Sequence, residues 1–190
     1  GDAKFKDLII SKLMDLKADG SFRLNMDYFN YATGLTMTSD KFHQLFDAPP
    51  RAREGNLNER EMDLAASIQC ITEEVMIKLA KHAAKITGCK NLCLAGGVAL
   101  NCVANGRLLQ EQIFDDIWIQ PASGDSGGAL GSAYCIYYQY LENSRIISDN
   151  IMDKMQGTYL GPSFSDQEIE ESLISIDAKY HLINDEDQLI

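Results

Sequence analysis

The sequence lacks a long hydrophobic run, and this excludes one class of protein at the outset. No apolar stretch among its 190 residues reaches the roughly 18 positions that a membrane-spanning helix needs. Basic residues are also scarce, since 17 lysines and arginines face 28 acidic residues and give a formal net charge of −11. Nucleic acids and anionic lipids attract basic faces, so this balance argues against a nucleic-acid or a membrane partner.

Disulfide and metal-binding patterns are missing as well. The five cysteines are an odd number, form no C-x-x-C pair and mostly stand among apolar residues, so we expect reduced thiols and a cytoplasmic protein. The three histidines are scattered and share no metal-ligand spacing with a cysteine. The chain begins with glycine and shows no signal-peptide pattern, and we expect it to be a piece of a longer chain.

The first 58 residues predict only short elements. Four apolar residues share one helical face and predict a short helix: Leu8, Ile9, Leu13 and Leu16. Residues 21–25 alternate apolar and polar side chains, as a short strand does. Residues 40–58 contain two adjacent prolines and Gly55, so we expect mostly loop there.

A long amphipathic helix is the clearest element. Asn58 and Glu61 form a capping-box pattern at its start, and Gly88 is expected to end it as a left-handed cap. Apolar residues recur every three or four positions in between: Leu64, Ile68, Ile71, Val75, Leu79, Ala83 and Ile86. Such a stripe predicts packing against a sheet or another helix along the whole length.

Two strands follow, and a glycine loop and a helix come after each. Residues 91–95 and 116–120 read as strands, the first as a continuous apolar run of the buried kind, and helices are expected over 98–110 and 129–141. The repeated order predicts a βαβα unit with parallel strands and an α/β fold. Beyond residue 150, nine acidic residues against two lysines indicate an acidic surface or the start of another domain, and Ser165 with Glu168 predicts a capped helix.

Both glycine loops follow the carboxyl end of a strand, where open α/β sheets bind their ligands. In the first, Gly96 and Gly97 permit close backbone approach, and the amides of the following helix start suit a phosphate or an adenylate. Asn101 is expected within the first helical turns, as a candidate to contact a nucleoside. The alternative is a tight turn in which the glycines only relieve crowding.

The second loop, residues 123–128, holds one carboxylate among glycines. Asp125 is a candidate ligand of a divalent metal, and the alternative is that it caps the helix that follows. The residues alone leave both roles open and single out no catalytic residue.

Taken together, the two loops closely resemble those of the O-carbamoyltransferases, a family that includes the Nod-factor (nodulation protein) enzymes and the enzymes that carbamoylate antibiotics. The segments that carry the resemblance are 91–106, with Ala-Gly-Gly-Val-Ala-Leu-Asn, and 117–131, with Ser-Gly-Asp-Ser-Gly-Gly. Shorter matching segments follow the family order: 19–24, 49–51, 63–69 and 161–165.

The resemblance implies an actin-like ATPase fold of the ribonuclease H-like kind. It also implies that ATP and carbamoyl phosphate give a carbamoyl-adenylate, whose carbamoyl group passes to a hydroxyl of a small-molecule acceptor, a sugar or natural product. By position, Gly96 and Gly97 would approach the adenylate, and Asn101 would contact the nucleoside. Asp125 would be one ligand of a divalent metal, iron by resemblance, with magnesium as the alternative.

The resemblance also implies that two parts of the family's architecture are missing. The first actin-like lobe, with histidine metal ligands, would precede this chain, and a YrdC-like domain would follow it. Residues 1–150 are therefore expected to be the second lobe of the transfer domain, and 151–190 an acidic linker or the start of the YrdC-like domain. We expect the isolated chain to be inactive. Two alternatives stay open: a lobe of an actin-fold sugar kinase, and a non-catalytic adapter lobe whose long helix docks a partner.

Overall fold

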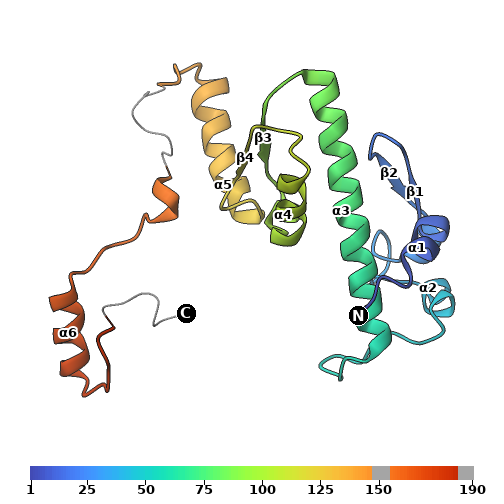
Figure 1. Ribbon diagram of the computed structural model, residues 1–190, viewed down its shortest axis with the longest axis horizontal. Coiled ribbons are helices and arrows are strands. Elements are labelled where there is room, and N and C mark those ends of the chain that lie inside the picture. Colours follow the sequence, from blue (N-terminus) through green and yellow to red (C-terminus); the bar gives the residue numbers. More distant parts are fainter. Residues whose placement is uncertain (147–154, 184–190) are drawn as a thin grey trace. The chain divides into compact units, whose positions relative to one another are not determined.

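The computed structural model describes residues 1–146 and 155–183 and divides the chain into two compact units (Figure 1). The first unit ends at Ser144 and the second begins at Arg145. The boundary predicted between residues 150 and 151 lies outside the described residues. No helix in the described part combines the length and the apolar character that crossing a membrane requires.

The first unit opens with a helix and a β-hairpin. Helix α1 spans Lys6–Lys12, and β1 (Met14–Leu16) pairs antiparallel with β2 (Phe22–Leu24). The strand predicted over 21–25 is thus confirmed. The prediction that Leu16 belongs to the helix is wrong. Leu16 pairs with Phe22 in the hairpin, where strand pairing satisfies its backbone hydrogen-bonding groups.

The segment predicted to be mostly loop, residues 40–58, contains a helix. Helix α2 spans Asp40–Leu45, and Phe42 lies one turn before Phe46 with their ring centroids 4.7 Å apart. Phe46 is only 4% exposed. These aromatic rings pack α2 against the core, and the two prolines lie beyond the end of this helix, so they do not prevent it.

Helix α3 (Glu59–Thr87) is the long helix that the sequence predicts. The capping box between Asn58 and Glu61 is confirmed, and Gly88 ends the helix in the left-handed conformation with φ 66°. The buried stripe nevertheless differs from the predicted one, since Ile68 is 51% and Leu79 44% exposed. Its buried side chains are Asp63, Ser67, Ile71, Val75 and Ala80.

Two polar residues occupy buried positions on α3 because they hold the N-terminal segment. The carboxylate of Asp63 accepts the backbone N–H of Asp2 at 2.7 Å and lies 2.9 Å from the ammonium of Lys4. The hydroxyl of Ser67 accepts the backbone N–H of Phe5 at 3.0 Å. Apolar periodicity alone does not reveal such positions, because hydrogen bonds rather than apolar contacts stabilise them.

The predicted βαβα unit is confirmed, and the fold is mixed α/β. Strands β3 (Asn91–Leu94) and β4 (Asp116–Ile119) pair in parallel, with α4 (Cys102–Gln110) between them in the chain and α5 (Asp125–Tyr134) after them. Along both strands exposed and half-buried residues alternate, so the expectation that the first strand is buried on both faces is wrong for this chain.

The two helices of this unit begin elsewhere than the sequence predicts. A 3₁₀ turn over Gly97–Leu100 precedes α4, because Asn101 leaves the helical region at φ −75° and ψ 90°. Helix α5 begins four residues before the predicted start and continues as a π-helix over Cys135–Tyr140.

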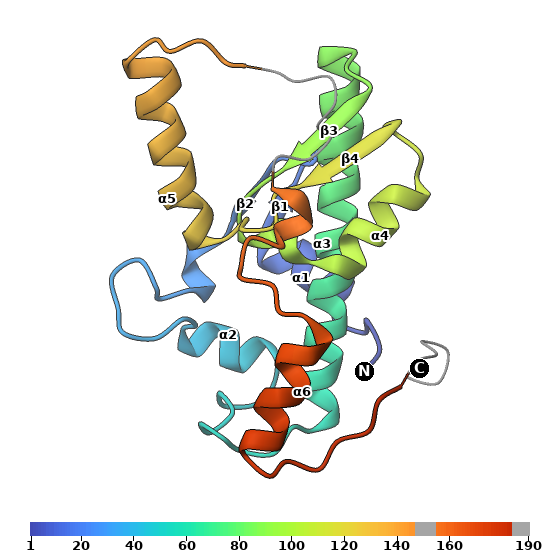
Figure 2. The same ribbon diagram turned by 90° about the vertical axis from the view of Figure 1, so that its left-hand side faces the viewer.

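Two hydrophobic clusters lie along α3. Figures 1 and 2 show the helices and strands that these clusters join. The first joins α1 and α2 to α3 and consists of Ile9, Leu13, Phe46, Ile71 and Val75. The second joins α3 to the strand pair and α4, and its buried members are Ala80, Leu108 and Phe114. In Figure 1, α3 runs between the hairpin and the β3–β4 pair, so it is the element that both halves of this unit share.

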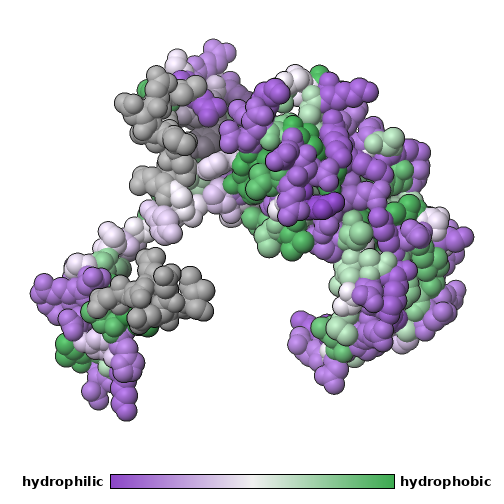
Figure 3. All heavy atoms as spheres, viewed as in Figure 1, coloured by the Kyte–Doolittle hydropathy of each residue, from purple (hydrophilic) through white to green (hydrophobic). Residues whose placement is uncertain are grey.

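Apolar side chains are also exposed beside the strand pair, where Figure 3 shows a green surface in the part of the view that α4 and the strands occupy. They include Val98, Leu100, Val103, Leu109 and Trp118.

In the second unit, α6 (Asp166–Ser175) confirms the predicted helix, and the capping box between Ser165 and Glu168 is formed at its start.

Candidate functional site

The first glycine loop has a backbone conformation that glycine alone adopts readily. Gly96 lies at φ 96° and ψ 161°, a region that residues with a Cβ atom avoid. A Cβ atom on Gly96 or on Gly97 would meet no atom within 4 Å beyond the adjoining residues. Of the alternative, a tight turn in which the glycines relieve crowding, the positive φ of Gly96 supports the turn, while no atom of the described residues beyond the neighbours crowds these positions. Gly96 is required by its dihedral angles, and the space next to both glycines is open.

The two glycine loops lie side by side at the carboxyl end of the parallel strands. Leu94 and Ile119, the last residues of β3 and β4, are register partners. Beyond them, the backbone N–H of Gly96 donates to the carbonyl of Ser123 at 2.9 Å. This hydrogen bond ties the first loop to the second, and the parallel register confirms that both loops follow the carboxyl ends of parallel strands.

The second loop is tightly folded. Ser123 is 5% exposed, and its hydroxyl donates to the carbonyl of Gln120. The N–H of Gly127 donates to the carbonyl of Gly124 at 3.0 Å. A Cβ atom on Gly127 would overlap the carbonyl oxygen of Ala122, so glycine is needed at this position for the close backbone approach.

Asp125 is the first residue of α5, and it is exposed. The capping role considered for it is wrong, because Gly124 is the N-cap residue and no side chain caps this helix. Within residues 1–146 and 155–183, no group of three or more histidine, cysteine, aspartate or glutamate side chains is arranged to hold a metal ion. One carboxylate does not make a metal site, so the described residues do not by themselves fit the divalent metal that the resemblance implies.

Asn101 precedes α4 as its N-cap residue and does not lie inside the first helical turns. Its Oδ1 accepts the backbone N–H of Ala104 at 3.0 Å. Its Nδ2 donates to Oε1 of Gln69 at 2.8 Å, and Nε2 of Gln69 donates back to Oδ1 at 3.2 Å. The side chain predicted to contact a nucleoside is thus joined to the middle of α3. The sequence shows nothing of this pair, since the two residues are 32 positions apart.

Asn105 supports the first loop from α4. Its Nδ2 donates to the carbonyl of Ala99 at 2.8 Å and so holds the 3₁₀ turn against the helix. Its Oδ1 is buried and has no hydrogen-bond partner in the part of the chain that the structure describes. The sequence offers no signal for this role beyond the spacing of one turn from Asn101.

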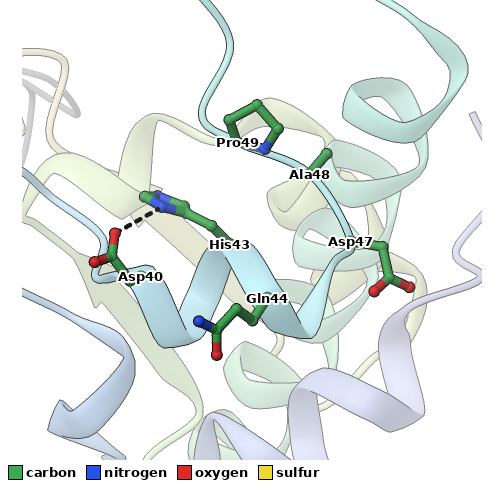
Figure 4. A pocket seen from close by; sticks show the side chains of 6 residues that line it. All are labelled: Asp40, His43, Gln44, Asp47, Ala48 and Pro49. Carbon is green, nitrogen blue, oxygen red and sulfur yellow. Dashed lines mark ion pairs between the residues drawn. The ribbon is translucent and has the colours of Figure 1, made fainter.

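A surface hollow of about 440 Å³ lies at α2, and it contains none of the predicted site residues (Figure 4). Nδ1 of His43 is 3.6 Å from Oδ1 of Asp40, and Nε2 of His43 is 2.9 Å from the hydroxyl of Thr38. Both ring nitrogens are thus engaged with neighbouring side chains. No predicted site residue lines this hollow, and the predicted site residues all lie in or next to the two glycine loops.

Comparisons with known proteins point to one family. The family model for the carbamoyltransferase N-terminus matches residues 1–134. An uncharacterised protein of Synechocystis is 57% identical over 189 residues, which cover 98% of this chain and 30% of that protein. Nodulation protein NolNO of Sinorhizobium fredii is 39% identical over 62% of this chain, and nodulation protein NolO of Bradyrhizobium diazoefficiens is 29% identical over 86%.

The chain spans less than a third of the length of each of these relatives, with 16% of NolNO and 27% of NolO covered. The matching family model nevertheless covers both glycine loops and the whole of α3. The chain therefore belongs to the carbamoyltransferase family.

Proposed function

We propose that the chain is part of an ATP-dependent carbamoyltransferase and that its two glycine loops form part of the adenylate site. The reaction would take carbamoyl phosphate and ATP to a carbamoyl-adenylate and then move the carbamoyl group to a hydroxyl of a small-molecule acceptor. The observation that carries the proposal is the hydrogen bond from Gly96 to Ser123, which joins two loops at the ligand-binding end of a parallel strand pair.

The first loop supplies what a nucleotide anion needs. Gly96 and Gly97 are exposed and have open space where a side chain would stand, so a phosphate group can approach their backbone closely. The 3₁₀ turn and α4 both start in this loop, and the first amides of a helical segment have no partner within it. Amides of this kind stabilise a phosphate or an adenylate by hydrogen bonding and by their dipoles.

In the transfer step, the acceptor oxygen would attack the carbamoyl carbon while the bond from that carbon to the adenylate oxygen breaks. AMP would leave with the electron pair of that bond, and the hydroxyl proton would pass to a base that the described residues do not identify. We assign Gly96, Gly97 and Asn101 to the nucleotide and Asp125 to the transfer step. The divalent metal stays a prediction from the resemblance, and no step is derived through it.

The remaining parts of the proposal concern the longer protein. We propose that residues 1–150 are the second lobe of an actin-like ATPase domain and that a first lobe and a YrdC-like domain complete the enzyme. The chain spans 30% or less of the relatives compared, which supports a site completed by other parts. A cytoplasmic location stays a prediction from the cysteines.

The two alternatives have less support than the carbamoyltransferase function. Membership of the carbamoyltransferase family does not favour a sugar-kinase lobe. An adapter lobe would need an apolar second face on α3, and Ile68 and Leu79 are indeed exposed there. Such exposure is equally expected in a chain that spans under a third of its relatives' length, so it does not favour the adapter.

The test is ATP–pyrophosphate exchange that depends on carbamoyl phosphate, measured in the full-length protein that carries this chain. We expect exchange in the wild type and in Asp125→Ala, because adenylate formation would precede the step assigned to Asp125. Asp116→Ala is the matched control, since this exposed carboxylate lies at the opposite end of β4.

Each outcome decides a separate point. An absence of exchange in the wild type would remove the carbamoyltransferase proposal. Exchange lost in Asp125→Ala but kept in Asp116→Ala would move Asp125 to adenylate formation. The isolated 190-residue chain is expected to show no carbamoyl transfer, and transfer by it alone would contradict the shared site.

A further inference from the structure

The amide pair between Asn101 and Gln69 connects the candidate nucleotide loop to α3. The two side chains exchange hydrogen bonds of 2.8 and 3.2 Å, and both residues are half-buried. Gln69 also donates from Nε2 to Oε1 of Glu73 at 2.9 Å, one turn further along α3. A continuous set of hydrogen bonds therefore runs from the surface of α3 to the start of α4.

Neighbouring groups fix the direction of both amides. The second contact of the Gln69 amide is a carboxylate, which only accepts, so the NH₂ end must face Glu73. The second contact of the Asn101 amide is the backbone N–H of Ala104, which only donates, so the oxygen of Asn101 must face Ala104. Neither amide can turn over without placing two donors or two acceptors together.

This arrangement commits most of the hydrogen-bonding capacity of Asn101. Its oxygen has two lone pairs, and it accepts from Ala104 and from Gln69. Its nitrogen has two hydrogens, of which one is donated to Gln69. One N–H of Asn101 is left without a partner among the described residues.

We propose that Gln69 is a positioning residue that orients Asn101 so that it offers a nucleotide one N–H donor and no acceptor. This inference rests on the proposed function, because it assumes that Asn101 faces the nucleotide. The group recognised is then an acceptor atom of the adenosine part, such as a hydroxyl oxygen or a ring nitrogen. Gln69 itself need not touch the ligand.

The test is calorimetric titration of AMP into the full-length protein that carries this chain. The variants are Gln69→Leu, Asn101→Ser and the double substitution. Serine is a preferred N-cap residue, so Asn101→Ser removes the amide while keeping a cap for α4. Gln110→Leu is the matched control, since Gln110 is an exposed glutamine at the end of α4.

One lost hydrogen bond corresponds to an affinity loss of about 2- to 12-fold. We expect that loss in Gln69→Leu and in Asn101→Ser, none in Gln110→Leu, and no further loss in the double variant. The non-additive result separates positioning from a general structural effect, because independent defects would multiply. A midpoint of urea unfolding equal to that of Gln110→Leu would show that Gln69→Leu stays folded.

Failure of this inference and failure of the proposed function give different results. If Gln69→Leu binds AMP as the wild type does while Asn101→Ser binds more weakly, Gln69 does not position Asn101. If the two losses multiply in the double variant, the residues act separately and the inference is likewise overturned. If the wild type binds no AMP, the proposed function is overturned together with the inference that rests on it.

Discussion

Replacing Gly96 by alanine tests whether the first loop depends on a conformation that only glycine adopts. At φ 96° and ψ 161°, a residue with a Cβ atom is strained by about 1–3 kcal/mol. No packing loss adds to this strain, because nothing beyond the adjoining residues lies within 4 Å of the new atom. The strain corresponds to roughly 5- to 150-fold in an equilibrium constant, at about 1.4 kcal/mol per factor of ten.

Gly97→Ala is the matched control for this experiment. Gly97 is the next residue, is equally exposed and open at its Cβ position, and does not have a positive φ. We expect Gly97→Ala to change the free energy of unfolding by less than about 0.5 kcal/mol. Gly96→Ala is expected to lower it by about 1–3 kcal/mol. Urea unfolding measures both values, provided that the slopes are equal.

Titration with AMP then separates stability from binding. If the loop must keep its conformation to bind the nucleotide, Gly96→Ala also lowers the affinity for AMP, by up to roughly the same 5- to 150-fold factor. Equal free energies of unfolding for Gly96→Ala and Gly97→Ala would refute the strain argument. A destabilised Gly96→Ala variant with unchanged AMP affinity would instead refute the role of this loop in binding.

Two further predictions concern the stability of the first unit. Gly20 and Gly88 both have positive φ, at 88° and 66°, but only a Cβ atom on Gly20 would lie 2.6 Å from the backbone nitrogen of Leu79. Gly20→Ala is therefore expected to cost about 1–3 kcal/mol more than Gly88→Ala in urea unfolding, and equal losses would contradict the close contact. The Lys4 ammonium lowers the pKa of Asp63 below its ordinary value of 3.8, so this carboxylate stabilises the fold above that pH and loses the effect as the pH falls through its folded-state pKa. The urea midpoints of wild type and Asp63→Asn are expected to converge as the pH is lowered from about 6, and a gap independent of pH would exclude the ion pair as its cause.

Features set by neighbouring residues could be predicted from the sequence. The ends of α3 followed from Asn58, Glu61 and Gly88, because a capping box and a left-handed glycine act within a few residues. The parallel strand pair followed from the repeated order of strand, glycine loop and helix. The caps of α3 lie within a few residues of its ends, whereas the strand pair joins segments 25 positions apart and was predicted from the order of the elements between them.

Features set by distant contacts could not be predicted. Leu16 has the spacing of a helical residue, but pairing with Phe22 places it in a strand. Asp63 breaks the apolar stripe of α3, and its burial depends on Lys4 and Asp2 at the start of the chain. Periodicity along one helix contains no information about which polar residues will find a partner elsewhere.

The candidate site belongs to this second class even though its motifs are local. Three contacts hold the first loop, and each comes from a different part of the first unit: the carbonyl of Ser123, the amide of Gln69 on α3, and the side chain of Asn105 on α4. Gln69 can reach the loop only where α3 packs against α4, and the buried cluster of Ala80, Leu108 and Phe114 fixes that packing. The glycine motif thus permits the loop conformation, whereas the packing of α3 selects it. If the proposed nucleotide site exists, substitutions in that cluster are expected to weaken AMP binding in calorimetric titration without touching the nucleotide, in proportion to how far they loosen α3 from α4.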